Sequence, residues 1–469
     1  MRDITIQLQI NSEKCLYEQI YEHIRKEIRE GKLFTGERLP STRSLADYLQ
    51  VARSTVEYAY DQLLSEGYIE ARPYRGYFVC AEADLANMTD MNASSPRFLP
   101  EKEEKPMTWV ADFSPHAIEM SEFPFGVWKR ITKNILNDGN QELFAQGEAQ
   151  GDLTLRQTIC RYLHSSRGVN CRPEQIIIGA GNDYLILLLE KILNGMRTIA
   201  MENPTYTRAY RIFQSMGYEM KQVSVDQGGL RVRELEETDA DLVYVMPSHQ
   251  YPTGAVMPIS RRNELLKWAS LGQNRFLIED DYDSEFRYKG KPIPSLQSSD
   301  SAGKVIYLGT FSKAIAPAIR VSYMVLPDSL LEKYWANCSF YSCTVSRIDQ
   351  RILDEFIRDG YFERYLNKMR KIYRGKHALV LELLKPFEKQ FMISGDNAGL
   401  HLVLTAKNGC SEKELLEKAA AVGVRVYGMS DSFVEQGNKK PSVLLGFGGL
   451  QPNELTEGIK RLRGVWLKD

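Results

Sequence analysis

Residues 305–320, VIYLGTFSKAIAPAIR, join a compact apolar run to a single lysine, and this run is one of a series. VIYLGT has the length and the β-branched and aromatic content of a buried strand. Similar runs precede it at IIIGAG, RTIAME, DLVYVMP and RFLIEDD, and each is followed by helical or turn sequence. Because buried strands alternate with helices, the pattern predicts an α/β fold with a mostly parallel sheet covered by helices on both faces.

Lys313 follows the end of this strand, between Ser312 and small apolar residues. A single lysine is more often a surface group, but an unprotonated lysine is also the nucleophile that forms Schiff bases with aldehydes. Thr310, Ser312 and Arg320 add two hydroxyls and a guanidinium, which suit a phosphate group. Residues in other segments must decide between the two interpretations.

Polar and aromatic residues follow the other strands as well. The turn at residues 179–181 in IIIGAGNDY precedes a helix, and backbone N–H groups at a helix start bind phosphate. Asp280 and Tyr282 follow the run RFLIE, where a carboxylate can pair with a protonated pyridine nitrogen and a phenol with a ring oxygen. Tyr206 in ENPTYTRAY can stack on a ring, and Gln250 in PSHQYPTG offers polar contacts. Each feature alone is also compatible with ordinary packing or a solvated loop.

The first 80 residues have a different pattern, which predicts three helices and a hairpin. Apolar residues at every fourth position from Leu16 to Ile28 predict a helix that Gly31 ends, and RLPSTRSLADYLQV supplies a second helix. In STVE, Ser54 is expected to cap a third helix, with Glu57 completing a capping box. YIEARPYRGYFVC then predicts two short strands around a turn. Two helices joined by a short turn and followed by such a wing form the winged helix-turn-helix, a DNA-binding arrangement.

The candidate DNA contacts lie at the start of the third helix, at the start of the second helix and in the wing. They are Ser41, Arg43, Arg53, Ser54, Thr55 and Arg75. Residues 11–80 contain ten Lys or Arg and eleven Asp or Glu, so one copy of the module is expected to bind DNA weakly. A small helical interaction domain is the alternative interpretation. The capped helix, the wing and LPSTRSLA together resemble the GntR family of bacterial repressors, and the resemblance implies operator binding as a dimer.

Composition limits the remaining classes. A chain of 469 residues exceeds the size of one hydrophobic core, and 60 basic against 61 acidic residues give no overall signal for nucleic acid. The seven cysteines include no C-x-x-C pair and no histidine at ligand spacing, so we expect reduced thiols and no metal site. No basic leader and no apolar stretch of membrane-spanning length occur, so we expect a cytoplasmic protein without a membrane partner.

Three segments are predicted along the chain. Residues 81–110 are rich in Ala, Ser, Asn, Pro and charge, which is typical of a linker between a module at 1–80 and a large domain at 111–469. Long helical patterns followed by GLHLVLTA and SVLLGFGGL predict a smaller α+β lobe at about 335–469.

The order of the features in the large domain resembles pyridoxal 5′-phosphate (PLP) proteins of the aspartate aminotransferase fold, fold type I. These features are a phosphate turn, a stacking aromatic, a P-T-G turn, a strand-end Asp and an S-K pair with a following Arg. The resemblance implies that Lys313 forms a Schiff base with PLP, that Asp280 holds the pyridine nitrogen and that Tyr206 stacks on the ring. The residues that it implies for cofactor binding are Ala180, Gly181, Asn182, Tyr206, Gln250, Asp280, Tyr282, Thr310, Ser312, Lys313 and Arg320.

A GntR-type module joined to an aminotransferase-like domain resembles the MocR subfamily of transcriptional regulators. CRPEQIIIGAG, MPSHQYPTG, IEDDYDSEF, GTFSK and NAGLH are similar to its GABA-responsive members. The resemblance implies a head-to-tail homodimer that binds double-stranded operator DNA. It also implies a small amine or amino-acid effector that reacts with PLP at Lys313 and thereby alters DNA binding.

Two positions bear on the identity of the effector. In GABA-responsive members, a pair of arginines is implied to hold the carboxylate of the effector. One of the two positions matches Arg208 in YTRAY, and the other falls on Asp431 in YGMSDSF. Because Asp reverses the charge, a carboxylate near Asp431 would be repelled, so GABA is disfavoured. An amino acid or small peptide with a cationic or polar group near Asp431 fits better, as does PLP itself as the signal.

Two other functions fit the same residues. The first is a working aminotransferase with an attached DNA-binding module. Aminotransferases commonly bind the substrate α-carboxylate with an arginine in the strand that matches SVLLGF, where this chain has Leu444. The second is a repressor whose large domain is a dimerisation scaffold without cofactor, and Lys313, Asp280 and Arg320 together argue against it. We therefore expect a sensor rather than an enzyme.

Overall fold

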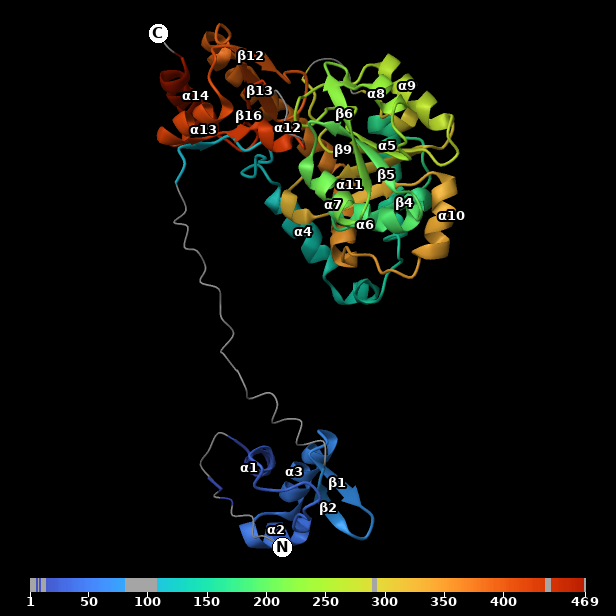
Figure 1. The fold of residues 1–469 in the computed structure, drawn as a ribbon, viewed down its shortest axis with the longest axis vertical. Helices are drawn as coiled ribbons and strands as arrows, with labels where there is room; N and C mark the ends of the chain where they lie inside the picture. Colours follow the sequence, from blue (N-terminus) through green and yellow to red (C-terminus); the bar gives the residue numbers. More distant parts are fainter. Residues whose placement is uncertain are drawn as a thin grey trace. The chain divides into compact units, whose positions relative to one another are not determined.

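The computed structural model describes residues 6, 8–9, 14–80, 108–288, 293–434 and 440–467. The chain divides into two compact units, Met1–Pro106 and Met107–Asp469. Figure 1 labels the helices and strands of both units. Most of the predicted linker, residues 81–107, lies outside the described residues.

Three helices and a two-stranded sheet make up the N-terminal unit. The elements are α1 (Leu16–Arg29), α2 (Thr42–Leu49), α3 (Arg53–Ser65), β1 (Ile69–Arg72) and β2 (Gly76–Val79). β1 and β2 pair in antiparallel register, and Ile69 and Val79 join the apolar core formed by the helices. The three helices and the wing that the sequence predicts are therefore present.

The start of α3 differs from the sequence prediction. The helix begins at Arg53 with Ala52 as its N-cap residue and no side-chain capping bond, so the predicted capping box is wrong. The physical reason is that the carbonyl oxygen of Ala52 already accepts from the N–H of Thr55 at 3.0 Å, which places Ser54 inside the first turn. Glu57 instead pairs with Arg53, with 2.8 Å between Oε1 and Nε.

An eight-stranded sheet forms the centre of the second unit, in the order β4-β11-β10-β9-β8-β5-β6-β7. Neighbours from β10 through β9, β8 and β5 to β6 are parallel, whereas β11 is antiparallel to both β10 and β4, and β7 to β6. Every residue of β8 and β9 is buried because both faces of the sheet are covered. The strands are β4 (Ile176–Gly179), β5 (Thr198–Asn203), β6 (Glu219–Asp226), β7 (Gly229–Leu230), β8 (Leu242–Val245), β9 (Phe276–Asp281), β10 (Val305–Thr310) and β11 (Ser322–Val325).

Helices cover this sheet on both faces, as the alternating pattern predicts (Figure 1). Ile178 of β4 joins a core with residues of α5 and α11, whereas its neighbour Ile177 joins a separate core with residues of α6 and α10. The helices are α4 (Phe125–Ile135), α5 (Leu153–Arg167), α6 (Asn182–Leu193), α7 (Thr207–Ser215), α8 (Val232–Glu236), α9 (Ile259–Ser270), α10 (Asp328–Asn337) and α11 (Arg347–Arg358). Short 3-10 turns are η2 (Asp138–Phe144), η3 (Pro173–Gln175), η4 (Gln297–Ser299) and η5 (Pro317–Ile319).

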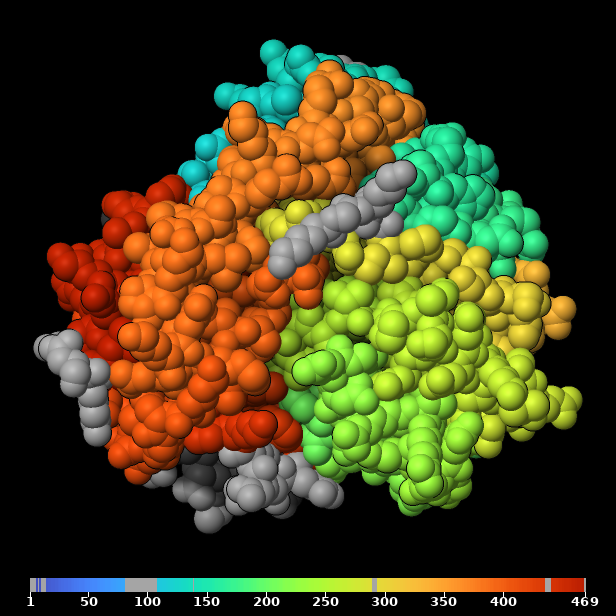
Figure 2. All heavy atoms as spheres, turned by 90° about the horizontal axis from the view of Figure 1, so that it is seen from above, coloured from blue at the N-terminus to red at the C-terminus, as the bar shows by residue number. Residues whose placement is uncertain are grey.

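A smaller α+β lobe completes the unit and lies directly against the part built on the large sheet (Figure 2). Its four-stranded sheet has the order β12-β13-β16-β15, and β14 pairs with β3 from the start of the unit. The strands are β3 (Ala111–Asp112), β12 (Phe391–Ser394), β13 (His401–Ala406), β14 (Val424–Arg425), β15 (Tyr427–Gly428) and β16 (Ser442–Gly446). The helices and 3-10 turns are α12 (Tyr361–Leu384), η6 (Lys385–Phe387), α13 (Glu412–Ala421), η7 (Met429–Ser432) and α14 (Pro452–Trp466). Across the described part of the chain, every helix is too short or too polar to span a membrane.

Candidate functional site

A cavity of about 660 Å³ lies at the carboxyl ends of β9 and β10 and also contacts the smaller lobe. This is the edge at which ligands bind in open α/β sheets. The predicted site residues that line it are Gly181, Asn182, Tyr206, Arg208, Asp280, Tyr282, Thr310, Ser312, Lys313, Arg320 and Asp431. The fold therefore brings most of the predicted cofactor and effector residues to one place.

Lys313 lines this cavity from the loop after β10. Its Nζ donates a hydrogen bond to the carbonyl oxygen of Pro115 at 2.9 Å. Burial lowers the pKa of Lys313 to about 8, and the charge of Asp283 opposes this shift. A lysine with such a pKa is partly unprotonated near neutral pH, so its amine can attack an aldehyde.

Asp280 lies near the end of β9 with only 4% of its surface exposed. The Tyr244 hydroxyl donates to its Oδ2, and the Asn182 amide donates to its Oδ1 at 3.2 Å. Burial raises the pKa of Asp280 to about 7, while the bond from Tyr244 opposes the shift. A cationic N–H in the cavity would favour the ionised carboxylate, so this group suits a protonated pyridine nitrogen.

Three aromatic rings line the cavity next to one another. The ring centroid of His116 lies 6.4 Å from that of Tyr206 and 5.6 Å from that of Tyr251. Burial, aided by the charges of Lys313 and Arg208, lowers the pKa of His116 to about 4, so this ring is neutral at pH 7. Sequence reasoning did not identify His116, because an isolated histidine far from the other motifs carries no signal. Tyr251 stood inside the quoted PSHQYPTG segment and could have been found there.

The start of α6 and Arg320 form a corner suited to an anion. Gly181 is the N-cap residue of α6 with φ +96°, and a Cβ atom there would lie 2.2 Å from Nη2 of Arg320. The positive φ favours glycine, and a side chain here would also push the Arg320 guanidinium away from the helix start. Arg320 Nη2 also lies 3.6 Å from the Asp183 carboxylate. A helix N-terminus beside a guanidinium is an arrangement that binds phosphate.

Tyr282 contacts a buried polar pair beneath the cavity. Its hydroxyl oxygen lies 2.9 Å from Nδ1 of His249, and the same nitrogen lies 2.9 Å from Oδ2 of Asp283. Burial raises the pKa of Tyr282 well above its usual range, so the phenol stays protonated. With the proton of His249 Nδ1 directed to the Asp283 carboxylate, the Tyr282 hydroxyl keeps its own proton for an oxygen atom in the cavity.

Two predicted cofactor residues do not line the cavity. The N–H of Ala180 donates to Oγ1 of Thr344 at 2.9 Å. Gln250 is 1% exposed, and its amide donates to the carbonyl oxygens of Pro204 at 2.8 Å and Tyr251 at 2.7 Å. These bonds commit the amide of Gln250 to holding the adjacent loops, and its role as a cofactor contact stays a prediction.

The residues predicted to contact the effector come from different elements. Arg208 lies in the first turn of α7, Asp431 in η7 and Leu444 in β16, and all three line the cavity. Arg208 is paired with Asp183, yet its side chain is 60% exposed. The cavity thus combines a cationic, an anionic and an apolar group.

In the N-terminal unit the candidate DNA contacts lie at the surface. Ser41, Arg43, Arg53, Ser54 and Arg75 are exposed, and Thr55 is partly exposed. The hydroxyl of Ser41 caps α2 by accepting from the N–H of Ser44 at 3.1 Å. Tyr74 at the tip of the wing, which the sequence analysis did not single out, has φ +61° and is fully exposed. These positions are accessible to the backbone and groove edges of DNA.

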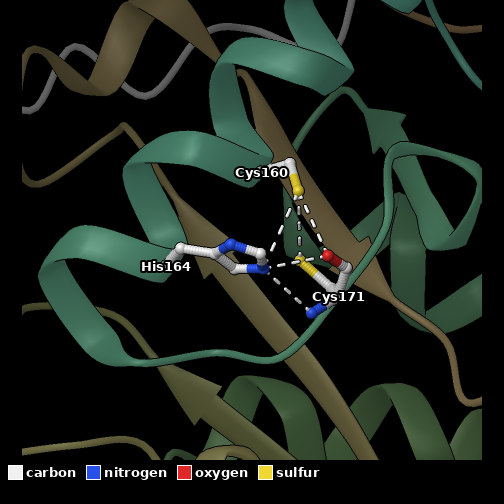
Figure 3. A group of neighbouring side chains, drawn as sticks. All are labelled: Cys160, His164 and Cys171. Atoms are coloured by element: carbon white, nitrogen blue, oxygen red, sulfur yellow. Dashed lines mark hydrogen bonds between the residues drawn. The ribbon is translucent and has the colours of Figure 1, made fainter.

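The expectation that no cysteine has a histidine at ligand spacing is wrong. Cys160, His164 and Cys171 place one Sγ or ring nitrogen each within 4.8 Å of one another (Figure 3). Cys160 and His164 are four residues apart on α5, the spacing at which side chains meet on a helix, and the sequence could have revealed this pair. Cys171 could not be assigned to them because it follows a turn.

The amino-acid sequence matches two family models and several full-length relatives. Residues 16–79 match the bacterial regulatory proteins of the gntR family, and residues 119–437 match the class I and II aminotransferases. The chain is 41% identical to the uncharacterized HTH-type transcriptional regulator YdeL of Bacillus subtilis, over 99% of both chains. It is 31% identical to the probable rhizopine catabolism regulatory protein MocR of Rhizobium meliloti, over 96% of this chain and 94% of the relative. The chain belongs to the MocR subfamily of GntR regulators.

The larger unit of this MocR-type regulator has the fold of an aminotransferase. The crystal structure of kynurenine aminotransferase from Pyrococcus horikoshii, in complex with PMP, is similar with a TM-score of 0.69 and 27% identity. The similarity covers 77% of this chain and 92% of that chain. The fold-type I prediction is confirmed. A GntR-type module indicates DNA binding, and a class I and II aminotransferase fold is in general PLP-dependent.

Proposed function

We propose that this MocR-type regulator binds PLP at Lys313 and that an amino-group effector reacts with PLP there to alter operator binding. The observation that carries the proposal is the convergence of Lys313, Asp280 and Arg320 on one cavity, in a chain that also has a GntR-type module. When bound, PLP supplies an aldehyde that bonds covalently to primary amines.

Each part of PLP has a fitting partner among the residues of the cavity. Arg320 and the start of α6 at Gly181 suit the phosphate, and Asp280 suits the pyridine nitrogen. Tyr206 offers a ring face, and Tyr282 a hydroxyl for the ring oxygen. The absence of a side chain at Gly181 lets the Arg320 guanidinium lie against the start of α6, and these two positively polarised groups support an anion at this corner.

The charges of the cavity favour an amino acid or small peptide as the effector. Arg208 attracts a carboxylate, whereas Asp431 repels one and attracts a cationic or polar group. Leu444 adds an apolar contact. GABA carries one carboxylate besides its amine and would lack a second guanidinium here, so it fits this cavity poorly.

The effector would contact two parts of the larger unit at once. Lys313 and Arg208 belong to the part built on the large sheet, and Asp431 and Leu444 belong to the smaller lobe. A ligand shifts a conformational equilibrium only by the difference in its affinity for the two states. We propose that the smaller lobe moves onto the effector and that this movement changes operator binding by a head-to-tail homodimer.

One titration of the full-length protein tests this function. The visible absorption of the cofactor and the affinity for operator DNA are followed together while candidate amines are added. We expect both to change over the same range of amine concentration, and we expect Lys313→Ala to lose the absorption and the effector response. The proposal would be contradicted if every amine that changes the absorption spectrum of the cofactor left the affinity for operator DNA unchanged.

A working aminotransferase with a DNA-binding module is the second candidate. The cavity residues favour it equally on the cofactor side, but Leu444, 1% exposed, stands where such enzymes commonly place the arginine for the substrate carboxylate. Sustained production of keto acid from an amino donor, measured with an excess of acceptor, would reverse the order of the two candidates.

A further inference from the structure

Cys160, His164 and Cys171 form a cluster in the larger unit that is separate from the Lys313 cavity. Cys160 and His164 lie in the last two turns of α5, and Cys171 lies in the turn between α5 and η3. Figure 3 shows the three side chains pointing toward a common centre. None of the three lines the cavity described above.

Two of the three distances within the cluster are close to those of a tetrahedral metal site. The two sulfur atoms are 3.9 Å apart, and Sγ of Cys160 lies 4.0 Å from Nε2 of His164. Zinc bonds of about 2.3 Å to sulfur and about 2.0 Å to nitrogen, at tetrahedral angles, place two sulfurs about 3.8 Å apart and a sulfur and a nitrogen about 3.5 Å apart. A contraction of a few tenths of an ångström would bring Sγ of Cys160 to bonding positions with the other two atoms. Sγ of Cys171 and the ring nitrogen of His164 lie within 4.8 Å of each other, so their approach requires a shift of up to about 1.3 Å.

The cluster is buried on one side and exposed to solvent on the other. Cys160 is 7% exposed and Cys171 is 4% exposed, and both belong to the apolar core of the sheet. His164 is exposed to solvent. Two thiols and one imidazole form a soft to borderline donor set, which selects zinc over magnesium or calcium, and the exposed side leaves room for water as a fourth ligand.

We propose that Cys160, His164 and Cys171 bind one Zn²⁺ ion through two thiolates and the Nε2 atom of the imidazole. Two sulfur–zinc bonds and one nitrogen–zinc bond form, and the two thiol protons pass to solvent, so no electron is transferred. Nε2 now lies 2.9 Å from the carbonyl oxygen of Cys171 and 3.3 Å from its N–H. In the zinc-bound state the ring carries its proton on Nδ1, and the metal bond replaces these contacts.

The ion would join the end of α5 to the segment that leads into β4. Arg167, one turn beyond His164 on α5, donates to Oδ2 of Asp281 at 2.7 Å and also to Ser248. Zinc therefore stabilises the end of the helix that fixes the carboxyl end of β9, on which Asp280 lies. The three zinc ligands do not line the Lys313 cavity, so zinc binding can be measured without PLP.

The test uses the full-length protein after treatment with a chelator and a phosphine reductant. Co²⁺ serves as the probe because thiolate-bound tetrahedral cobalt absorbs at longer wavelengths than PLP, and Zn²⁺ is then added as a competitor. We expect one equivalent of Co²⁺ per chain, displacement by one equivalent of Zn²⁺, and a higher thermal unfolding temperature with zinc bound.

Variants separate this site from other thiols. His164→Ala changes an exposed side chain and should leave the fold intact. We expect this variant to lose the bound equivalent of Co²⁺, and we expect the same of Cys160→Ser and Cys171→Ser. Cys338→Ser, which removes a buried thiol outside the cluster, is the matched control and should retain it. Absence of a stoichiometric cobalt spectrum in the wild-type chain would overturn the proposal, as would full binding by His164→Ala and Cys171→Ser. A wild-type chain that only forms a Cys160–Cys171 disulfide on oxidation, without binding metal when reduced, would also overturn it.

Discussion

Replacing Lys313 by methionine is expected to stabilise the cofactor-free protein near neutral pH, although it removes the reactive amine. Burial lowers the pKa of Lys313 from 10.5 to about 8, whereas the unfolded chain keeps the ordinary value. Holding the protonated amine in the cavity therefore costs roughly 3 kcal/mol at pH 7. Methionine has a similar length and no charge, and it loses only the hydrogen bond to Pro115, worth about 1 kcal/mol. The net gain in the free energy of unfolding is then about 2 kcal/mol.

This gain depends on pH in a defined direction. The pKa of Lys313 is lower in the folded state than in the unfolded state. The destabilisation by the protonated amine is therefore fully present below about pH 8 and disappears as the pH rises through 10.5. Thermal unfolding of the cofactor-free protein should show a rise of about 2–3 °C for Lys313→Met at pH 7 and no rise at about pH 10. Lys333→Met, at an exposed position of α10, is the matched control. A lower unfolding temperature for Lys313→Met at pH 7, or the same change at both pH values, would refute the reasoning.

Three further changes have defined outcomes. Gly181→Ala places a Cβ 2.2 Å from Nη2 of Arg320, so the affinity for PLP, measured by equilibrium dialysis, should fall at least about tenfold. Gly375→Ala is the control and should leave this affinity unchanged, because a Cβ there meets no atom within 4 Å. Asp431→Arg supplies the second guanidinium and should shift effector preference toward GABA in a spectral titration; an unchanged preference would remove Asp431 from the effector site. Arg75→Ala in the exposed wing should weaken operator binding and lower the slope of log affinity against log salt by about 1, measured by fluorescence anisotropy, and an unchanged slope would exclude a phosphate contact.

The central sheet could be predicted from the sequence because buried strands leave a continuous apolar run. VIYLGT became β10 at Val305–Thr310, and DLVYVMP contains β8 at Leu242–Val245. Such runs end where the sheet ends, so polar residues just after them, such as Asp280 and Lys313, could be placed at one edge. The cavity brings these two groups together as expected.

Contacts between distant segments could not be predicted in the same way. His116 reaches the cavity from a segment that carries no motif, and Gln250 uses its amide on backbone groups that no spacing reveals. Ser54 has the residue type of a helix cap, but the backbone bond from Thr55 to Ala52 fixes an earlier start. Cys171 joins Cys160 only because the chain reverses after α5 at Gly168, a left-handed residue with φ +66°.

The identity of the residue that holds the cofactor tests the central claim most directly. The PLP-loaded protein is reduced with borohydride, digested, and the peptide that contains Lys313 is analysed by mass spectrometry. We predict that Lys313 carries the reduced phosphopyridoxyl group in wild-type protein. An unmodified Lys313, with the group on another lysine or on none, would contradict PLP binding at this site and the sensing function that depends on it.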